Sequence, residues 1–258
     1  KGNFPGYVAI IASIITPIFI SMASFAINDY FDIEVDKANN KKNAPLVSGE
    51  ITKNEALWVT AITLIIGVFA SVFINYYAFV MAFIFGALAM LYSYKLKEIL
   101  LIGNIYIAFS MAIPFIYGNF VVADKFSFAI LIVSSMVFIS GLAREIHGTI
   151  RDYNGDKKRK INSLPKVIGI IPSAIVAAIL YIIAVIISIY LFLFKLKFHS
   201  FIYLGLILLT DILIMYVSIN YLRKKSSKFY NLSRNLSLLA MGIALFGILL
   251  APITYFAF

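Results

Sequence analysis

The sequence predicts an all-α, polytopic membrane protein built as a bundle of transmembrane helices. Hydrophobic residues make up 62% of the 258 residues and charged residues only 13%, against about 25% charged residues in an average soluble domain. The mean hydropathy is +0.95. The apolar residues are gathered in eight runs, each close to the ~20 residues that an α-helix needs to cross a bilayer core.

The eight predicted spans follow one another with polar connections. Several contain proline, which a helix in lipid tolerates when neighbouring helices satisfy the freed backbone groups. The predicted spans cover approximately residues 6–28, 54–74, 76–94, 100–122, 126–147, 167–194, 199–222 and 236–257.

The basic residues are distributed unevenly between the predicted loops. The net charge is +10, and 18 of the 22 Lys and Arg lie on the side that also carries two acidic clusters. By the positive-inside rule that side is cytoplasmic. The basicity therefore sets the topology in the cell membrane and favours anionic lipid headgroups, and it requires no nucleic-acid partner. The absence of cysteine excludes disulfides and thiolate ligands.

The first acidic cluster follows the first predicted span and contains Asn28, Asp29, Asp32 and Asp36. If the helix continues through the cluster, the three aspartates lie at i, i+3 and i+7 and share one face with Asn28. Like charges at this spacing repel, and carboxylates near a helix C-terminus face the negative end of the helix dipole. A bound hard cation removes both penalties, and oxygen-only ligands suit Mg²⁺. The cluster therefore predicts a magnesium site.

The second acidic cluster follows the fifth predicted span. Asp152 and Asp156 are one helical turn apart, and Asn154 and Gly155 are expected to loosen or end the helix there. Four spans separate the two clusters, so the chain returns to the same side of the membrane. Both clusters are therefore predicted to line one cavity, as in folds made of parallel membrane repeats.

The two clusters are also related in sequence. Residues 32–49 match residues 152–169 at six of eighteen positions, and such internal similarity at a fixed offset indicates duplicated structural units. The matching pairs are Asp32 and Asp152, Asp36 and Asp156, Lys37 and Lys157, Pro45 and Pro165, Val47 and Val167, and Gly49 and Gly169. We predict a single domain over residues 1–258, with pseudo-repeats of four helices each at about 6–122 and 126–257.

These motifs resemble those of the UbiA superfamily of intramembrane prenyltransferases. The string from Asn28 to Asp36, followed by Pro45-Leu46-Val47-Ser48-Gly49, looks like the first signature of that family, and the string from Asp152 to Asp156 looks like the second. The segment Tyr92-Ser93-Tyr94-Lys95-Leu96-Lys97 is similar to the Tyr/Lys loop between them. The resemblance implies nine transmembrane helices, of which one would precede Lys1.

The resemblance also implies roles for particular residues. Two Mg²⁺ ions, one at each cluster, would bind a prenyl diphosphate. For an alcohol acceptor, Asp29, Asp36 or the released diphosphate would act as the base. The family's usual arginine before the first-motif proline is replaced here by Ala44, so the adjacent lysines are expected to take over its phosphate contacts. The expected metal ligands are Asn28, Asp32, Asp36, Asp152 and Asp156. The residues expected at the diphosphate or substrate are Lys41, Lys42, Tyr92, Lys95, Lys97, Arg144 and Arg151.

The acceptor is the least determined part of the prediction. The motif strings look most like those of digeranylgeranylglyceryl phosphate synthases, which transfer a geranylgeranyl group to the hydroxyl of geranylgeranylglyceryl phosphate and form the second ether bond of archaeal lipids. Within the superfamily, the alternative is 4-hydroxybenzoate or another aromatic quinone precursor. A cation transporter is the alternative outside enzymes, although its acids should lie at mid-bilayer on broken helices. A CDP-alcohol phosphotransferase is disfavoured because its Asp-Gly…Ala-Arg motif is absent.

Three further polar sites are interpreted more simply. Asp211 lies within a predicted span and is assigned a structural role, with Thr210 and Ser218 as its packing partners. His147 is assigned either to the pocket or to a polar helix end. The basic run from Arg223 to Lys228 is assigned to lipid headgroups.

Overall fold

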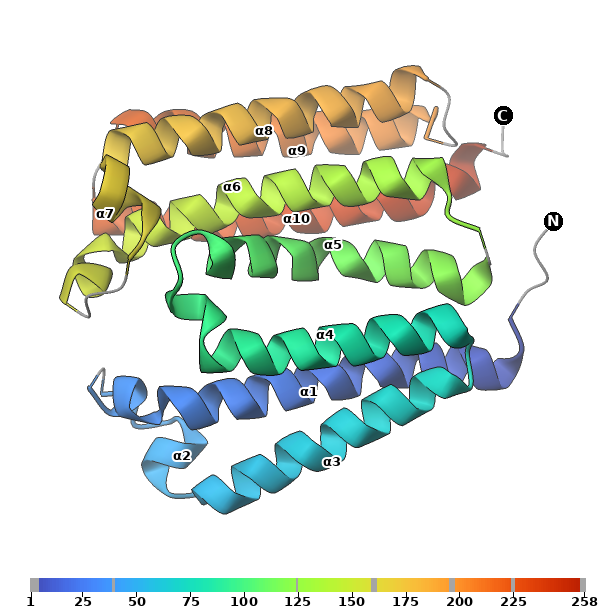
Figure 1. The fold of residues 1–258 in the computed structure, drawn as a ribbon. Coiled ribbons are helices and arrows are strands. Elements are labelled where there is room, and N and C mark those ends of the chain that lie inside the picture. Colours follow the sequence, from blue (N-terminus) through green and yellow to red (C-terminus); the bar gives the residue numbers. More distant parts are fainter. Residues whose placement is uncertain are drawn as a thin grey trace. The chain divides into compact units, whose positions relative to one another are not determined.

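The computed structural model describes residues 5–38, 40–123, 125–158, 162–194, 198–223 and 226–255, without the side chains of residues 154–158, 227 and 252–255. Within these ranges the regular structure is helical and contains no strand (Figure 1), which confirms the all-α prediction. Eight of the described helices are long and apolar enough to cross a membrane. They are α1 (Tyr7–Ala38), α3 (Lys53–Val72), α4 (Tyr76–Tyr94), α5 (Ile102–Val122), α6 (Phe128–Lys158), α8 (Ile170–Leu193), α9 (Phe201–Arg223) and α10 (Ser227–Tyr255).

Large apolar side chains cover the outward faces of these helices. Phe25, Ile65 and Phe246 are 72%, 67% and 64% exposed. Apolar side chains exposed along whole helices are unfavourable in water but suit a hydrocarbon environment, where only the backbone must be satisfied internally. The eight apolar helices make this a multi-pass membrane protein.

Two helices extend further than their predicted spans. α1 continues to Ala38 and therefore carries the whole first acidic cluster, as the spacing of its aspartates required. α6 continues to Lys158, so the predicted end near Asn154 and Gly155 is wrong. A glycine in a helix interior costs about 1 kcal/mol relative to alanine, and the helical residues on either side of Gly155 outweigh that local preference.

The first compact unit of the fold consists of Lys1–Lys97 and Tyr117–Phe126. In this unit α1 packs along α3 and α4. α3 begins at a capping box in which the Thr52 side chain accepts a hydrogen bond from the backbone N–H of Glu55 and the Glu55 side chain accepts one from that of Thr52. α3 and α1 approach closely at Gly67, where a Cβ atom would lie 2.9 Å from the Ile20 side chain. Small residues allow such close helix contacts in membranes.

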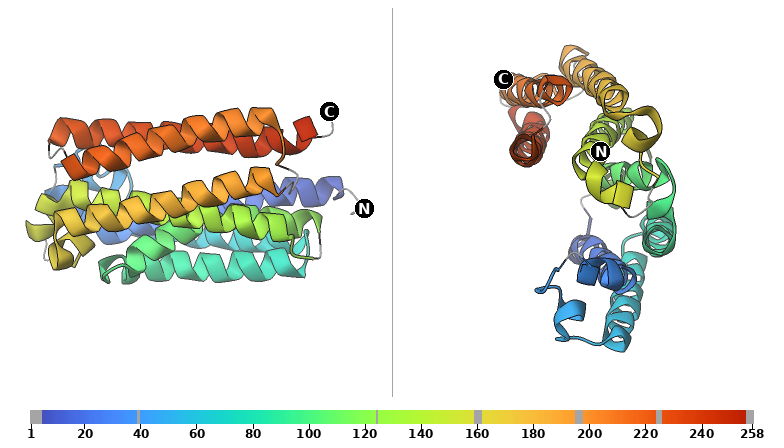
Figure 2. Two further views of the ribbon diagram at one scale, coloured as in Figure 1. Left: turned by 90° about the horizontal axis from the view of Figure 1, so that it is seen from above. Right: turned by 90° about the vertical axis from the view of Figure 1, so that its left-hand side faces the viewer.

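The second compact unit consists of Glu98–Ile116 and Ser127–Phe258. In this unit α8 packs against α6 and α9, and α9 packs against α10 (Figure 2). Small buried residues, Ala143, Ala174 and Ala177, lie in its core beside the ring of Tyr181. The division between the units falls within α5, whereas the pseudo-repeats place that helix wholly in the first half. Duplication of the four-helix units stays a prediction.

Asp211 is buried within the second unit and hydrogen-bonded across two helices. The Ser188 hydroxyl on α8 donates to its carboxylate at 2.9 Å, and the Tyr203 hydroxyl donates to the Ser188 carbonyl oxygen at 3.0 Å. A buried polar group is tolerated when it is paired in this way. These contacts are consistent with a structural role for Asp211. The Thr210 hydroxyl donates to carbonyl oxygens of α9 and α10, and the packing of Thr210 and Ser218 against Asp211 stays a prediction.

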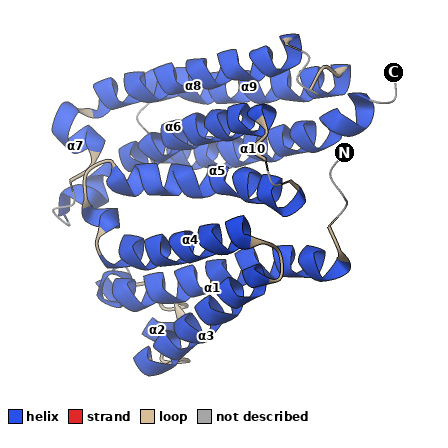
Figure 3. Cartoon of the chain, turned by 45° about the vertical axis from the view of Figure 1, so that its right-hand side comes forward, coloured by secondary structure: helices blue, strands red, loops and turns tan. Residues whose placement is uncertain are grey.

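Two short helices follow the acidic clusters in the connecting segments (Figure 3). They are α2 (Pro45–Ser48) and α7 (Leu164–Ile168), and each has proline in its first two positions. Each is followed by a glycine with positive φ, +81° at Gly49 and +93° at Gly169. Positive φ favours glycine, which gives a physical reason for the same residue at both matched positions. The two turns nevertheless differ, because ψ is 11° at Gly49 and 162° at Gly169.

Candidate active site

The first acidic cluster lies on the C-terminal third of α1, where the helical spacing brings its side chains together. The Asn28 amide donates to the Asp32 carboxylate at 3.0 Å. The Lys97 ammonium forms an ion pair with the other Asp32 oxygen at 2.6 Å. Asp36, only 6% exposed, pairs with Lys41 at 2.6 Å. The structure thus joins residues 65 positions apart at one carboxylate.

Asp29 is the exposed member of the cluster. It lies close enough to Asp32, Asp36 and Lys41 to interact with them electrostatically. Asp29 forms no ion pair among the described residues, whereas Asp32 and Asp36 are each held by a lysine. Asp29 is therefore the cluster carboxylate that is most open to a second molecule.

The predicted Tyr/Lys loop lies at the end of α4 and in the 3-10 turn η1 (Leu96–Glu98) that follows. Lys95 is the C-cap residue of α4, and Tyr92 lies in the last turn of the helix. The Tyr94 ring contacts Phe31 with a centroid distance of 5.6 Å, which ties the end of α4 to α1. This packing brings Lys97 to the cluster. Lys42 is exposed and has no ion pair to the cluster among the described residues.

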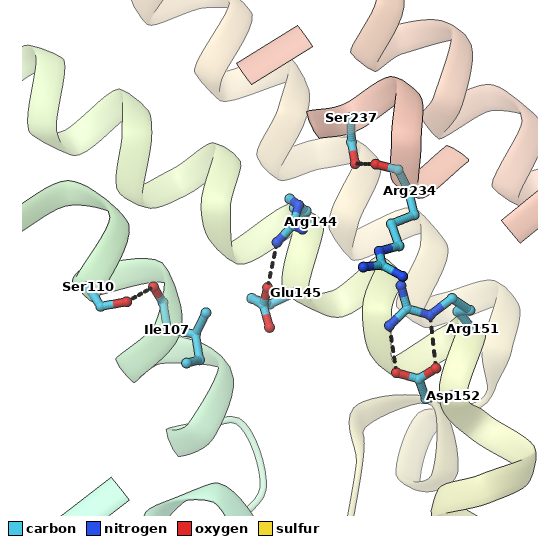
Figure 4. Close-up of polar contacts among 8 residues, drawn as sticks. All are labelled: Ile107, Ser110, Arg144, Glu145, Arg151, Asp152, Arg234 and Ser237. Atoms are coloured by element: carbon cyan, nitrogen blue, oxygen red, sulfur yellow. Dashed lines mark hydrogen bonds and ion pairs between the residues drawn. The ribbon is translucent and has the colours of Figure 1, made fainter. Parts of the chain in front are cut away.

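The second cluster lies at the C-terminal end of α6 (Figure 4). The Arg151 guanidinium donates to both Asp152 carboxylate oxygens, from Nε at 2.9 Å and from Nη2 at 2.8 Å. The Arg144 guanidinium donates to Glu145 at 3.0 Å. The backbone of Asp156 lies in α6, but its side chain is outside the described residues, so its predicted role as a ligand stays a prediction.

Each described aspartate that is predicted to bind metal is therefore paired with a basic side chain. Such charge-assisted pairs offset the mutual repulsion of the carboxylates. The basic partners, Lys41, Lys97 and Arg151, are the residues predicted to bind phosphate oxygens. In both clusters, the carboxylates expected to bind Mg²⁺ are therefore in contact with the basic side chains expected to bind the diphosphate oxygens.

A comparison with protein families shows which family the chain belongs to. The model of the UbiA prenyltransferase family matches residues 1–239. The chain belongs to the UbiA prenyltransferase family. It is therefore a prenyltransferase, and the resemblance of its acidic motifs to those of the superfamily is confirmed.

Individual UbiA relatives agree with the family assignment. The chain is 36% identical over 90% of its length to a digeranylgeranylglyceryl phosphate synthase of Archaeoglobus fulgidus, of which it covers 80%. It is 37% identical over 86% of its length to the synthase of the same name from Methanocaldococcus jannaschii, of which it covers 79%.

Solved UbiA structures have the same fold. A structure described as that of digeranylgeranylglyceryl phosphate synthase aligns with a TM-score of 0.81 and 30% identity, over 98% of this chain and 88% of that one. A UbiA homolog from Archaeoglobus fulgidus bound to GPP and Mg²⁺ aligns with a TM-score of 0.67 and 20% identity, over 95% of this chain and 89% of that one.

Sequence reasoning missed or left open several residues near the UbiA motifs. Glu145, the partner of Arg144, was not assigned. His147 is 4% exposed and stacks on the Tyr221 ring at a centroid distance of 3.8 Å, so it is a core residue and not a helix-end cap. Arg234 was placed in a loop, although it lies on α10. The helical spacing of Arg144, His147 and Arg151 on α6 could have placed His147 on the same helix face as the two arginines, but it gives no signal for Glu145 or Arg234.

Proposed function

We propose that the protein transfers a geranylgeranyl group from geranylgeranyl diphosphate to the free hydroxyl of geranylgeranylglyceryl phosphate. The observation that carries this proposal is the 36% identity, over 90% of the chain, to a digeranylgeranylglyceryl phosphate synthase. The bond between C1 of the prenyl group and the diphosphate oxygen breaks, and an ether bond to the glycerol oxygen forms. Diphosphate leaves, and the hydroxyl proton passes to a base.

Mg²⁺ is the proposed cofactor, and the donor set of this chain fits it. Asn28, Asp32 and Asp36 offer only oxygen ligands from one helix face. Mg²⁺ takes few ligands from protein carboxylates and several from water and substrate phosphates. When bound, Mg²⁺ supplies positive charge that stabilises the leaving diphosphate. Asp152 and Asp156 are the proposed ligands in the second cluster.

The basic residues of the site are proposed to bind the diphosphate oxygens. Lys97 forms an ion pair with Asp32, and Lys41 forms one with Asp36. A diphosphate bound to Mg²⁺ at these carboxylates would therefore lie close to both ammonium groups. Lys42, Lys95 and Tyr92 are proposed to contribute further contacts to the diphosphate. Both clusters are proposed to act on a single diphosphate at the cytoplasmic side of the membrane, as the duplicated motifs and the positive-inside rule suggest.

A carboxylate of the first cluster is proposed as the base that accepts the hydroxyl proton. A general base must reach the reacting hydroxyl and have a free lone pair. Asp36 is buried and held by Lys41, whereas Asp29 is exposed. The contacts therefore favour Asp29 over Asp36.

The ion pair between Lys97 and Asp32 allows a test of the diphosphate contact. We expect Lys97→Met to lower kcat/KM for the prenyl diphosphate by about 10- to 100-fold, because a charge-assisted hydrogen bond contributes roughly 1.5–3 kcal/mol. Lys97→Arg should retain part of the activity. Lys37→Met is the matched control, since Lys37 pairs with Glu34 on the surface and both side chains are at least half exposed. Equal kinetics for Lys97→Met and Lys37→Met would remove Lys97 from the site.

The acceptor is tested directly with purified protein, Mg²⁺ and geranylgeranyl diphosphate. We expect product from geranylgeranylglyceryl phosphate and none from 4-hydroxybenzoate, with both acceptors assayed by mass spectrometry. Conversion of the aromatic acid alone would overturn the proposed acceptor while leaving the family assignment intact.

A further inference from the structure

One face of α6 carries three nitrogen-rich side chains toward the interior of the second unit. Arg144, His147 and Arg151 lie at i, i+3 and i+7, the spacing of side chains on one helix face. The His147 ring stacks on Tyr221 of α9 and lies 5.5 Å, centroid to centroid, from Tyr181 of α8. This face therefore points toward α8 and α9 and not toward lipid.

α10 adds a third arginine to this face. In Figure 4 the guanidinium of Arg234 reaches from α10 and points toward that of Arg151. Tyr230, one turn earlier on α10, stacks on Tyr221 with a centroid distance of 5.2 Å. Tyr230 of α10 therefore packs against Tyr221, the residue that also stacks on His147. Three guanidinium groups from two helices thus border one region of the unit.

The described side chains do not neutralise these three arginines. Arg151 pairs with Asp152 and Arg144 with Glu145, while Arg234 has no ion pair among the described residues. Among the side chains that the structure describes, which do not include Asp156, three positive charges therefore face two negative ones. Arg151 already has the Asp152 carboxylate beside it, so Arg234 is the guanidinium that a further anion would neutralise.

Buried polar atoms at the same face also have unused hydrogen-bonding capacity. The Nε atom of Arg144 and both ring nitrogens of His147 are buried without a partner among the described residues. His147 as a whole is 4% exposed. Buried polar groups are normally satisfied, and those left unsatisfied in a native structure indicate a bound water, ion or ligand. An anion with several oxygens would offset the positive charge and could accept hydrogen bonds from the Arg144 Nε–H and from the one N–H of a neutral His147 ring.

We propose that Arg144, Arg151 and Arg234 form a subsite for the phosphate monoester of the lipid acceptor, separate from the diphosphate site of the donor. This inference rests on the proposed function. Glycerol has three carbons, so the phosphate of the acceptor is only a few bonds from the hydroxyl that attacks C1. Its binding site must therefore lie beside a metal-binding cluster, and Arg151 holds Asp152 of that cluster. Guanidinium groups also bind phosphate with paired hydrogen bonds.

The subsite is tested by varying the protein and the acceptor together. We expect Arg234→Ala to raise KM for geranylgeranylglyceryl phosphate by about 10- to 100-fold and to leave KM for geranylgeranyl diphosphate within about twofold. Arg234 is exposed, so its loss should not disturb folding. With geranylgeranylglycerol, which lacks the phosphate, wild type and Arg234→Ala should have the same kcat/KM. Arg144→Gln should show the same pattern as Arg234→Ala.

The matched control is Arg223→Ala, which removes an exposed arginine from the end of α9 and should change neither KM. An equal loss with both acceptors, a raised donor KM, or an unchanged acceptor KM in Arg234→Ala would overturn the subsite. Displacement of the acceptor by excess phosphatidic acid in the same micelles would assign the arginines to membrane lipids in general and would also overturn it.

A binding measurement tests the subsite independently of the proposed function. Binding of geranylgeranylglyceryl phosphate to the donor-free protein is measured by titration calorimetry for wild type and Arg234→Ala. Weaker binding by the variant supports the subsite even if wild type gives no product, in which case only the proposed function fails. Product formation by wild type with equal binding by both proteins would leave the function intact and overturn the subsite.

Discussion

Asp32→Ala and Asp152→Ala are each expected to reduce kcat by about 1000-fold or more, while the protein remains folded. Each substitution removes a carboxylate that is proposed to hold Mg²⁺ at the diphosphate. Metal stabilisation of a leaving group contributes several kcal/mol, and each 1.36 kcal/mol corresponds to a tenfold change in rate. The measurement is product formation under saturating substrate, with circular dichroism and size-exclusion chromatography to verify the fold.

The position of the two residues explains why folding should survive. The side chain of Asp32 is 26% exposed and that of Asp152 is 54% exposed, so neither substitution leaves a large cavity. Glu34→Ala is the matched control, because Glu34 is on the same helix but is 75% exposed and pairs only with Lys37. Near wild-type turnover in Asp32→Ala or in Asp152→Ala would contradict the proposal that both clusters act in the reaction.

Removal of Mg²⁺ by EDTA is expected to abolish prenyl transfer reversibly and to leave the helical fold intact. Many metal proteins unfold without their ion because carboxylates repel one another or because the ion holds the fold together. Here Asp32, Asp36 and Asp152 are each paired with a lysine or arginine, so basic side chains offset most of that repulsion in the metal-free clusters, and only the exposed Asp29 keeps it. The measurement combines turnover before and after Mg²⁺ is restored with thermal melting in detergent.

The control for this experiment is the same protein treated with EDTA and excess Mg²⁺ together, which should retain both its rate and its melting temperature. Turnover that persists after complete chelation would contradict Mg²⁺ dependence. A large fall in melting temperature would contradict the assigned role of the three ion pairs, even if activity were lost as expected.

The membrane helices could be predicted from sequence because their signal is local. A run of about 20 apolar residues is sufficient, and the eight spans were found in this way. The spacing of Asp29, Asp32 and Asp36 also predicted that α1 continues through the acidic cluster. Asn154 and Gly155 predicted that α6 loosens or ends there. The prediction of an end is wrong, because the helix continues to Lys158.

The contacts of the candidate site could not be predicted because they depend on tertiary packing. Nothing local in the sequence indicates that Lys97 meets Asp32 across 65 positions, since this contact requires α4 to pack along α1. Arg234 was missed for a related reason. Its segment is polar enough to resemble a loop, and only the structure places it on α10 beside the aromatic cluster around Tyr221.

The lengths of α1 and α6 have a consequence for how substrates reach the enzyme. α1 has 32 residues and α6 has 31, so at 1.5 Å per residue each is roughly 46–48 Å long, against a hydrocarbon core of about 30 Å. Both helices therefore extend well past the acyl chains at the end that bears the aspartates. Charged heads of prenyl substrates would be held level with the lipid phosphates while their tails stay dissolved in the bilayer. Both substrates could then enter by lateral diffusion, without ever passing through water.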